Sequence, residues 1–223
     1  MTGASEQILR LTLASATLEG ALRIPEGATG IVLFAHGSGS SRHSPRNRYV
    51  AQALNEGGLA TLLIDLLTAA EESEDDRTAR LRFNIRMLAH RVTGASDWLL
   101  ENAATKHLRI GYFGASTGAA AALEAAAARP SEIGAVVSRG GRPDLALADL
   151  GRVQAPTLLI VGGRDSAVIE MNREAFEHLQ TEKRLAIVPE ATHLFEEPGA
   201  LEQVAHLARD WFAGHLSQFR DVR

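Results

Sequence analysis

The regular alternation of short apolar runs with longer helical patterns constrains the fold of this chain most. Six runs dense in Val, Ile and Leu lie at residues 31–35, 61–65, 108–113, 135–138, 157–161 and 184–189. Each is long enough for a strand buried on both faces, which is typical of parallel sheets. Helical patterns occupy residues 45–56, 81–99, 117–129, 169–180 and 200–212. This order predicts an α/β fold in which a mostly parallel sheet carries helices on both faces.

The segment before the first apolar run has a different pattern of apolar and polar residues. Apolar and polar residues alternate over residues 8–13 and 18–24, and a Pro-Glu-Gly turn at 25–27 ends the pattern. This pattern predicts two antiparallel strands that open the sheet. The acidic run at 71–76 is interpreted as the solvated start of the helix that follows it. No linker rich in Pro, Gly or Ser interrupts the chain, so we expect one domain over residues 1–223.

Composition narrows the class of function. The 223 residues are 45% hydrophobic and 22% charged, with a formal net charge of −4 and no cysteine. Such a chain has no broad basic surface for nucleic acid and no disulfide, thiolate nucleophile or Cys-based metal site. It has no signal-peptide pattern at its start and no apolar run long enough to cross a membrane. We therefore expect a cytoplasmic protein that binds neither nucleic acid nor membrane and has no metal site.

The sharpest local motif is Gly-Ala-Ser-Thr-Gly at 114–118. It follows a predicted strand directly and precedes an alanine-rich helix. A sharp strand-to-helix turn exposes one side chain above the sheet, and the flanking glycines allow a close approach of the backbone. This context predicts Ser116 as a nucleophile; the alternative is that Ser116 only caps the helix.

A serine hydroxyl needs a base within hydrogen-bond reach. Among the eight histidines, His193 lies in the loop after the last strand run, and therefore at the same sheet edge as Ser116. His36 is the competitor at that edge, but its glycine-rich setting favours another role. We therefore predict that His193 is the general base.

The imidazole in turn needs an acceptor that fixes its tautomer. Asp165 follows the strand run at 157–161 and lies between Ser116 and His193 in the sequence. The order Ser, Asp, His is expected of α/β-hydrolases. Asp144 is the alternative, although its position next to Pro143 favours a helix cap.

The tetrahedral intermediate requires hydrogen-bond donors for its oxyanion. The backbone N–H of Thr117, at the start of the helix after the nucleophile, is one candidate. The second is expected from the loop Phe-Ala-His-Gly-Ser-Gly-Ser-Ser at 34–41, where we predict the N–H of Ser38, with Gly37 as the alternative. The same loop lacks the endings of a P-loop or a dinucleotide fingerprint.

Taken together, these four motifs resemble the α/β-hydrolase superfamily, and within it the small dienelactone-hydrolase-like proteins. The resemblance extends from about residue 7 to residue 212. It implies an eight-stranded, largely parallel sheet and hydrolysis of an ester, lactone or related acyl bond without a cofactor.

One departure from that family concerns the nucleophile. True dienelactone hydrolases have a cysteine where this chain has Ser116, which argues against dienelactone as the substrate. Only about 18 residues separate the strand runs that end at 138 and begin at 157, too few for a large lid domain, so we expect an open site. Arg42, Arg46 and Arg139 lie in loops at the catalytic edge, where Arg42 and Arg139 are candidate ligands for an acidic group of the substrate.

The expected partner is a small ester or lactone, and the chain could form a homodimer. Two alternatives to a hydrolase stay open. The fold could serve as a non-catalytic binding or regulatory module, since fold does not guarantee activity. The same triad could also serve an acyltransferase or perhydrolase, because pocket shape and water access select the acyl acceptor.

Overall fold

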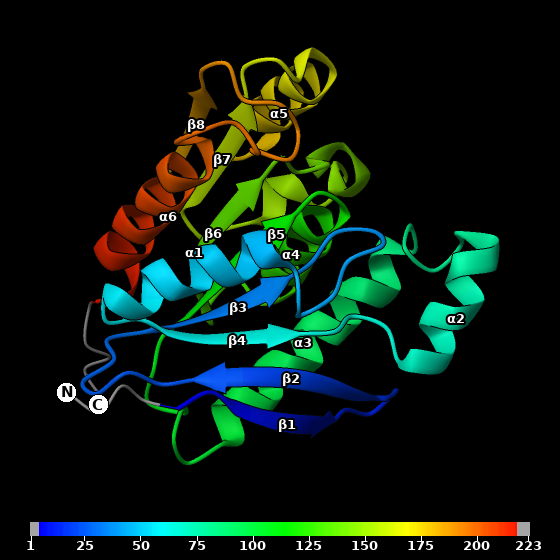
Figure 1. Cartoon of the computed structure of the whole chain (residues 1–223), viewed down its shortest axis with the longest axis vertical. Helices are drawn as coiled ribbons and strands as arrows, with labels where there is room; N and C mark the ends of the chain where they lie inside the picture. The colour runs from blue at the N-terminus through cyan, green and yellow to red at the C-terminus, as the bar shows by residue number, and fades with distance from the viewer. Residues whose placement is uncertain (1–4, 218–223) are drawn as a thin grey trace.

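All eight strands form one sheet in the computed structural model, which describes residues 5–217 (Figure 1). The order across the sheet is β1-β2-β4-β3-β5-β6-β7-β8. The strands are β1 (Gln7–Thr12), β2 (Thr17–Arg23), β3 (Ile31–Ala35), β4 (Ala60–Ile64), β5 (Ile110–Ala115), β6 (Ile133–Arg139), β7 (Thr157–Gly162) and β8 (Lys183–Val188). The α-helices are α1 (Pro45–Glu56), α2 (Ala69–Thr78), α3 (Ile85–Glu101), α4 (Thr117–Ala128), α5 (Ser166–His178) and α6 (Ala200–Leu216). Two short 3-10 helices, η1 (Pro143–Ala146) and η2 (Leu150–Arg152), lie between β6 and β7.

The sheet is antiparallel only at its N-terminal end. β1 pairs antiparallel with β2, and β2 pairs antiparallel with β4, whereas every pairing from β4 to β8 is parallel. Exposed residues predominate in β1 at the sheet edge, while the central strands β3, β4 and β5 are buried throughout. This arrangement confirms the expected α/β-hydrolase fold with an eight-stranded, mostly parallel sheet.

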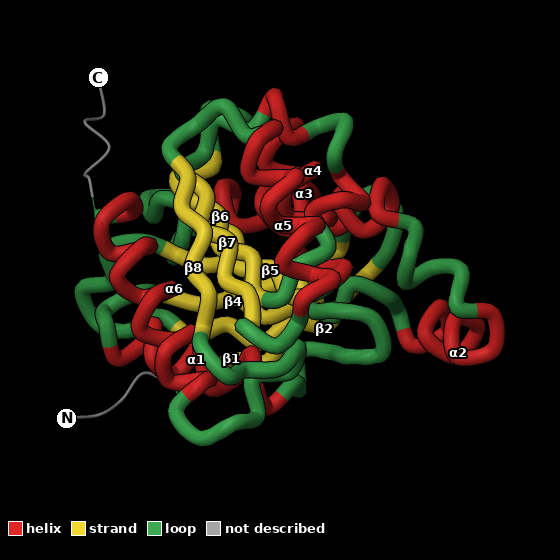
Figure 2. The backbone as a smooth tube through the Cα atoms, turned by 90° about the horizontal axis from the view of Figure 1, so that it is seen from above, coloured by secondary structure: helices red, strands yellow, loops and turns green. Residues whose placement is uncertain are grey.

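Helices cover both faces of the sheet (Figure 2). α1 and α6 pack on one face over a core that includes Phe34, Phe113 and Phe212. α3, α4 and α5 pack on the other face, where the alanine-rich helix α4 lies over the central strands. Alanine at most positions of α4 permits this close approach, because no large side chain separates the helix from the sheet.

The sequence predicted that the acidic run at 71–76 begins the helix that follows it, and this prediction is wrong. The run belongs to a separate helix, α2, which projects from the body of the molecule (Figures 1 and 2). Thr68 and Glu71 form a capping box at its start, and Asp75 is its only buried residue. Because α2 lacks an apolar stripe, its capping box and its ion pairs hold it in place, and no apolar face packs against the body of the molecule.

The parallel strands place their C-terminal ends at one edge of the sheet. Ala35 of β3 pairs in register with Ile64 of β4 and Gly114 of β5, while Ala115 pairs with Arg139 of β6. The loops that follow these strands therefore meet above this edge, which is where ligands bind in open α/β sheets. Within residues 5–217 no helix is both long and apolar enough to span a membrane.

Candidate active site

Ser116 occupies the turn between β5 and α4 in a backbone conformation that L-residues rarely adopt. Its φ is 51° and its ψ is −122°. The backbone N–H of Ser116 donates to the carbonyl oxygen of Arg139 at 3.3 Å, which ties the turn to the neighbouring strand. The side chain of Ser116 makes no capping hydrogen bond to α4. Strain of this kind costs about 1–3 kcal/mol and persists only where the surrounding structure enforces it, so the turn is not explained by helix capping.

The two glycines that flank Ser116 allow this turn to pack against its neighbours. A Cβ atom at Gly118 would lie 2.3 Å from the carbonyl oxygens of both Ala35 and His36. A Cβ atom at Gly114 would lie 2.4 Å from the Cα atom of Ala119. Any side chain at either position would therefore push the turn away from the loop that follows β3 or from α4.

His193 is paired with Asp165. The Nδ1 atom of His193 lies 2.6 Å from Oδ2 of Asp165, a distance typical of a charge-assisted hydrogen bond. The carboxylate of the alternative, Asp144, instead accepts two hydrogen bonds from Arg142, at 2.9 and 2.8 Å. With Nδ1 occupied by Asp165, the Nε2 atom of His193 is left to accept or donate a proton elsewhere.

The loops that carry these two residues are joined through their backbones. Gly163 N–H donates to Val188 O at 2.8 Å, and Arg164 N–H donates to Ala191 O at 2.9 Å. Phe195, two residues after His193, is fully buried and has a positive φ of 57°. The histidine loop is thus fixed at its start by β7 and at its end by a buried aromatic ring.

Ser116 and His193 approach the same residue, Gly140. Gly140 directly follows Arg139, the acceptor of the Ser116 N–H, and a Cβ atom at Gly140 would lie 3.5 Å from Cε1 of His193. Among residues 5–217 there is no hydrogen bond between the Ser116 hydroxyl and the His193 ring. The structure therefore joins His193 to Asp165 and brings it to the Ser116 turn; the role of each as a catalytic residue stays a prediction.

The predicted oxyanion donors lie on two segments that touch. The hydroxyl groups of Ser38 and Thr117 are 3.0 Å apart, although 79 residues separate them in the sequence. A Cβ atom at Gly37 would lie 2.9 Å from Cβ of Ser116. The glycine-rich loop therefore lies directly against the nucleophile turn, and its backbone can approach a group bound at Ser116.

His36 holds this loop against the segment that follows β4. It is buried, its Nε2 accepts a hydrogen bond from the N–H of Leu66 at 2.9 Å, and its Nδ1 lies 2.9 Å from the carbonyl oxygen of Gly37. Burial lowers the pKa of His36 below its ordinary value of 6.5, so the ring stays neutral at neutral pH. Both ring nitrogens are engaged by backbone groups, which leaves His193 as the histidine with a nitrogen available at this edge.

The three arginines predicted at this edge have different surroundings. Arg42 forms ion pairs with Asp65 and Glu19, so its guanidinium group is already neutralised. Arg46 pairs with Glu196 at 3.1 Å. These contacts argue against Arg42 as a ligand for an acidic substrate group.

Arg139 is buried, and its contacts are uncharged. Its Nη2 donates to Oδ1 of Asn47 at 3.3 Å, and its guanidinium carbon lies 5.9 Å from the ring centre of Phe195. Burial, together with the nearby charge of Arg46, lowers the pKa of Arg139 to about 10. Arg139 is therefore still charged at neutral pH, and its predicted contact with substrate stays a prediction.

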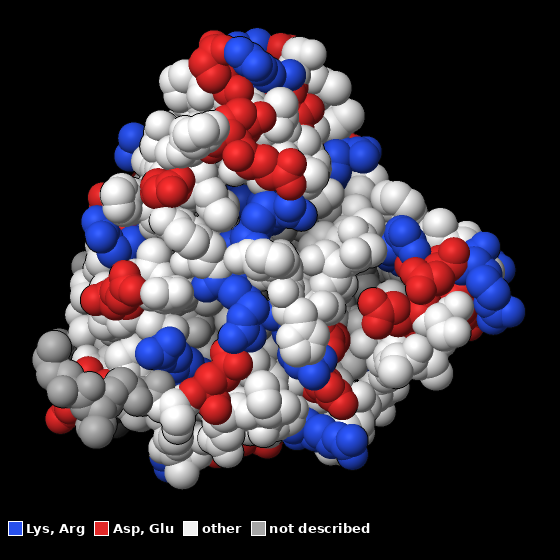
Figure 3. Space-filling view, viewed as in Figure 1, with Lys and Arg blue, Asp and Glu red and all other residues white. Residues whose placement is uncertain are grey.

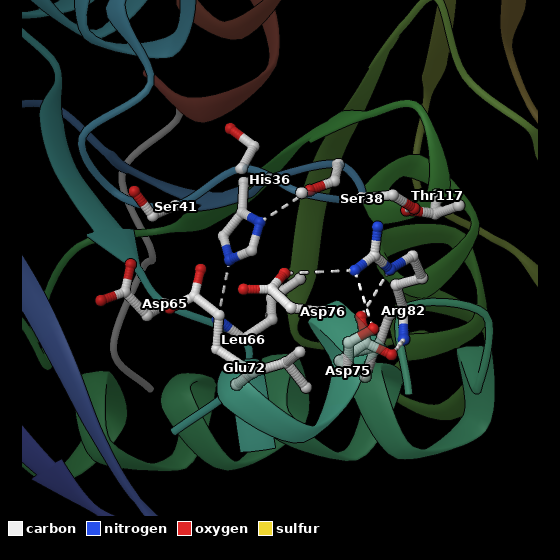
Figure 4. A pocket seen from close by; sticks show the side chains of 15 residues that line it. His36, Ser38, Ser41, Asp65, Leu66, Glu72, Asp75, Asp76, Arg82 and Thr117 are labelled. Carbon is white, nitrogen blue, oxygen red and sulfur yellow. Dashed lines mark hydrogen bonds and ion pairs between the residues drawn. The ribbon is translucent and has the colours of Figure 1, made fainter. Parts of the chain in front are cut away.

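A pocket opens beside the oxyanion loop (Figure 4). It lies over the ends of β3 and β4, whereas Arg139 ends β6 on the other side of β5. The pocket lies between the loop at 36–41 and helix α2 and is open to solvent. Ser38 and Thr117 line it from the loop and from α4, and Glu72, Asp76 and Arg82 line it from α2 and the segment after α2. Sequence reasoning missed these last residues, because the acidic run was assigned to a solvated helix start. α2 therefore forms one wall of a site that the sequence led us to expect as open.

The sheet order, the strained turn after β5 and the histidine–aspartate pair define an α/β-hydrolase. Residues 18–222 match the dienelactone hydrolase family, and the chain belongs to that family. A crystal structure of dienelactone hydrolase from Anabaena variabilis is 63% identical in sequence, with a TM-score of 0.94 over 96% of this chain and 99% of that chain. The chain is therefore dienelactone-hydrolase-like, as the motifs predicted.

Two further comparisons extend this assignment. The esterase Est1E from Butyrivibrio proteoclasticus superposes with a TM-score of 0.78 over 93% of this chain and 98% of that chain, but is only 15% identical, so it supports the fold alone. A Mycobacterium tuberculosis protein named "Putative phosphoribosyl transferase" is 58% identical over 197 residues. That match covers 88% of this chain and 44% of the relative, so the chain spans less than half the length of this curated relative.

Proposed function

We propose that this hydrolase cleaves carboxylic esters, lactones or related acyl bonds of small substrates through an acyl-enzyme on Ser116. The observation that carries the proposal is the pairing of His193 with Asp165 at 2.6 Å beside the strained turn that presents Ser116. Backbone strain of this kind clusters at active sites, ligand clamps and switch regions.

The reaction would proceed in two halves. The Oγ atom of Ser116 attacks the acyl carbonyl carbon while His193 takes the hydroxyl proton, and Asp165 stabilises the imidazolium that forms. The backbone amides near Thr117 and Ser38 hold the negative charge of the carbonyl oxygen. His193 then gives its proton to the leaving alkoxide, and water repeats the sequence on the acyl-enzyme to release the acid.

Phosphoribosyl transfer is a weaker candidate for this chain. The name of the M. tuberculosis relative applies to a protein more than twice as long as the region that matches. The matched region of this chain includes the turn at Ser116, the glycine-rich loop and the family's hydrolase fold. These features support acyl transfer to water, so we assign the hydrolase activity to this chain.

Turnover of p-nitrophenyl acetate tests the proposal. We expect the wild-type protein to release nitrophenolate and the Ser116→Ala variant to lose this activity, with an unchanged circular dichroism spectrum. Full activity in the folded Ser116→Ala variant would contradict the proposal.

A further inference from the structure

The pocket beside the oxyanion loop combines an apolar floor with an acidic wall. Leu66, Leu67 and Leu88 supply the apolar part of its lining. Helix α2 and the loop after it supply charged groups, and Figure 4 places the side chains of Glu72, Asp76 and Arg82 around the opening. The four carboxylates that line the pocket belong to Asp65, Glu72, Asp75 and Asp76.

Arg82, whose guanidinium group lines this pocket, is paired through two of its three nitrogens. Nε of Arg82 donates to Oδ2 of Asp75 at 2.5 Å, and its Nη2 atom donates to the carbonyl oxygen of Asp75 at 3.0 Å. The same Nη2 atom lies 3.5 Å from Oδ1 of Asp76. Glu72 has no ion-pair partner among residues 5–217. Nη1 of Arg82 has no hydrogen-bond or ion-pair partner among residues 5–217, and it lies 3.8 Å from where a Cβ atom of Gly39 would stand. Four carboxylates against one guanidinium group still give the lining a net negative charge.

This lining extends to the predicted oxyanion donors, next to Ser116. Ser38 and Thr117, whose amides are the predicted oxyanion donors, line the same pocket. The charges of Asp65 and Glu72 both act on the ring of His36, directly beneath the oxyanion loop. A substrate bound at Ser116 that extends one end into the pocket would place that end within reach of these carboxylates. A carboxylate or phosphate there would meet four carboxylates and one guanidinium group, so the net effect of the lining on an anion is repulsion.

The surroundings of Ser116 differ in charge between the two sides of β5. The pocket lies over the ends of β3 and β4, whereas the buried Arg139 ends β6, and β5 with Ser116 lies between them. Figure 3 shows acidic and basic side chains grouped on the projecting lobe formed by α2, beside a hollow in the surface. α2 is thus placed to select the part of the substrate that enters on its own side.

We propose that this pocket is a specificity pocket that accepts an uncharged, mainly apolar group of the substrate, and that Glu72 and Asp76 exclude anionic groups from it. The inference rests on the proposed hydrolysis of esters at Ser116 and adds the class of group that the site accepts. It departs from the expectation of an acidic substrate held by Arg42, whose charge is neutralised by Asp65 and Glu19.

The test compares two pairs of substrates of equal length that differ only in charge. The acyl pair is p-nitrophenyl hydrogen adipate and its neutral amide, p-nitrophenyl adipamate. The leaving-group pair is the S-acetyl derivatives of mercaptopropionate and mercaptopropionamide. We expect a preference of about tenfold or more in kcat/KM for the neutral member of at least one pair, since like charges brought together in a site disfavour the wrong ligand. This preference should fall at high salt, because salt screens exposed carboxylates.

Variants of α2 identify the residues responsible. The double variant Glu72→Gln/Asp76→Asn should reduce the preference for the neutral substrate by about threefold or more. Glu74→Gln is the matched control, since Glu74 is exposed on the same helix and does not line the pocket, and it should leave the preference unchanged.

The outcomes separate the specificity pocket from the hydrolase activity itself. Equal kcat/KM within both pairs, or a preference that survives the double variant unchanged, would overturn the role of the pocket while leaving the hydrolase intact. If wild-type protein turned over neither neutral substrate, or if Ser116→Ala retained that turnover, the proposed function itself would be wrong, and the specificity inference with it.

Discussion

The Nδ1 atom of His193 lies 2.6 Å from the Oδ2 atom of Asp165, although the two residues are 28 positions apart and follow different strands. The backbones of their loops are hydrogen-bonded, so the pair is held by the ends of β7 and β8 rather than by the two side chains alone. A carboxylate in this position fixes the tautomer of the imidazole and stabilises its protonated form.

Replacement of Asp165 should therefore remove most of the activity. Asp165→Asn keeps the shape of the side chain but favours the wrong tautomer of His193, and we expect kcat to fall by about 10⁴. Steady-state turnover of p-nitrophenyl acetate measures this fall. Asp144→Asn is the control, because Asp144 pairs with Arg142, and it should cost less than tenfold. The reverse order of the two effects would assign the orienting role to Asp144.

The strained backbone of Ser116 predicts that substitution by glycine raises the stability of the protein while it abolishes activity. Glycine adopts a φ of 51° without strain, so Ser116→Gly should raise the free energy of unfolding by about 1 kcal/mol while it abolishes turnover. Ser116→Ala retains a Cβ atom and should change stability by less than about 0.5 kcal/mol. Denaturant titration of both variants provides the comparison. Equal stability of the two would mean that the turn at Ser116 is not strained.

The close packing around Gly118 predicts that one added methyl group destabilises the protein. A Cβ atom added at this position would lie 2.3 Å from two carbonyl oxygens of the oxyanion loop. Gly118→Ala should therefore lower the free energy of unfolding by about 2 kcal/mol or more and reduce turnover. Gly214→Ala is the matched control in α6, where a Cβ atom meets nothing within 4 Å. This control should instead stabilise the protein by about 0.5–1 kcal/mol. Destabilisation by both substitutions to the same extent would refute the close approach at Gly118.

The lowered pKa of His36 predicts a loss of stability in acid. Below pH 6.5 the unfolded chain takes up a proton at His36 more readily than the folded protein does, so the unfolded state binds more protons and stability falls as pH falls. Between about pH 7.5 and about pH 5.5 this residue alone should cost on the order of 1 kcal/mol.

Unfolding at the two pH values in the His36→Gln variant tests the assignment. The variant should be less stable at the higher pH, because it loses the acceptor for Leu66 N–H, but the pH-dependent loss should shrink. His206→Gln, an exposed position on α6, should retain the wild-type pH dependence. An unchanged pH dependence in His36→Gln would show that the pKa of His36 is the same in the folded and unfolded protein.

Much of the site could be predicted from the sequence because strand ends determine where loops meet. Apolar runs marked the six parallel strands, and residues just after them were assigned to one sheet edge. That reasoning placed His193 and Asp165 together and set Asp144 aside, and the structure has the same pairing.

Other features depend on contacts that no local pattern reveals. Helix α2 has no apolar stripe, and its geometry depends on the capping box at Thr68 and on the pairing of Asp75 with Arg82. Arg42 was predicted as a candidate ligand for an acidic substrate group, yet it pairs with Asp65, directly after β4, and with Glu19 of β2. The wall of the specificity pocket could not be foreseen for the same reason.

Labelling with a fluorophosphonate probe tests the central claim most directly. The folded wild-type protein is treated with the probe and digested, and its peptides are analysed by mass spectrometry. The account predicts one adduct, on the hydroxyl of Ser116, that is absent from Ser116→Ala and forms far more slowly in His193→Ala. An unlabelled wild-type protein, or an adduct on a different residue, would contradict the account.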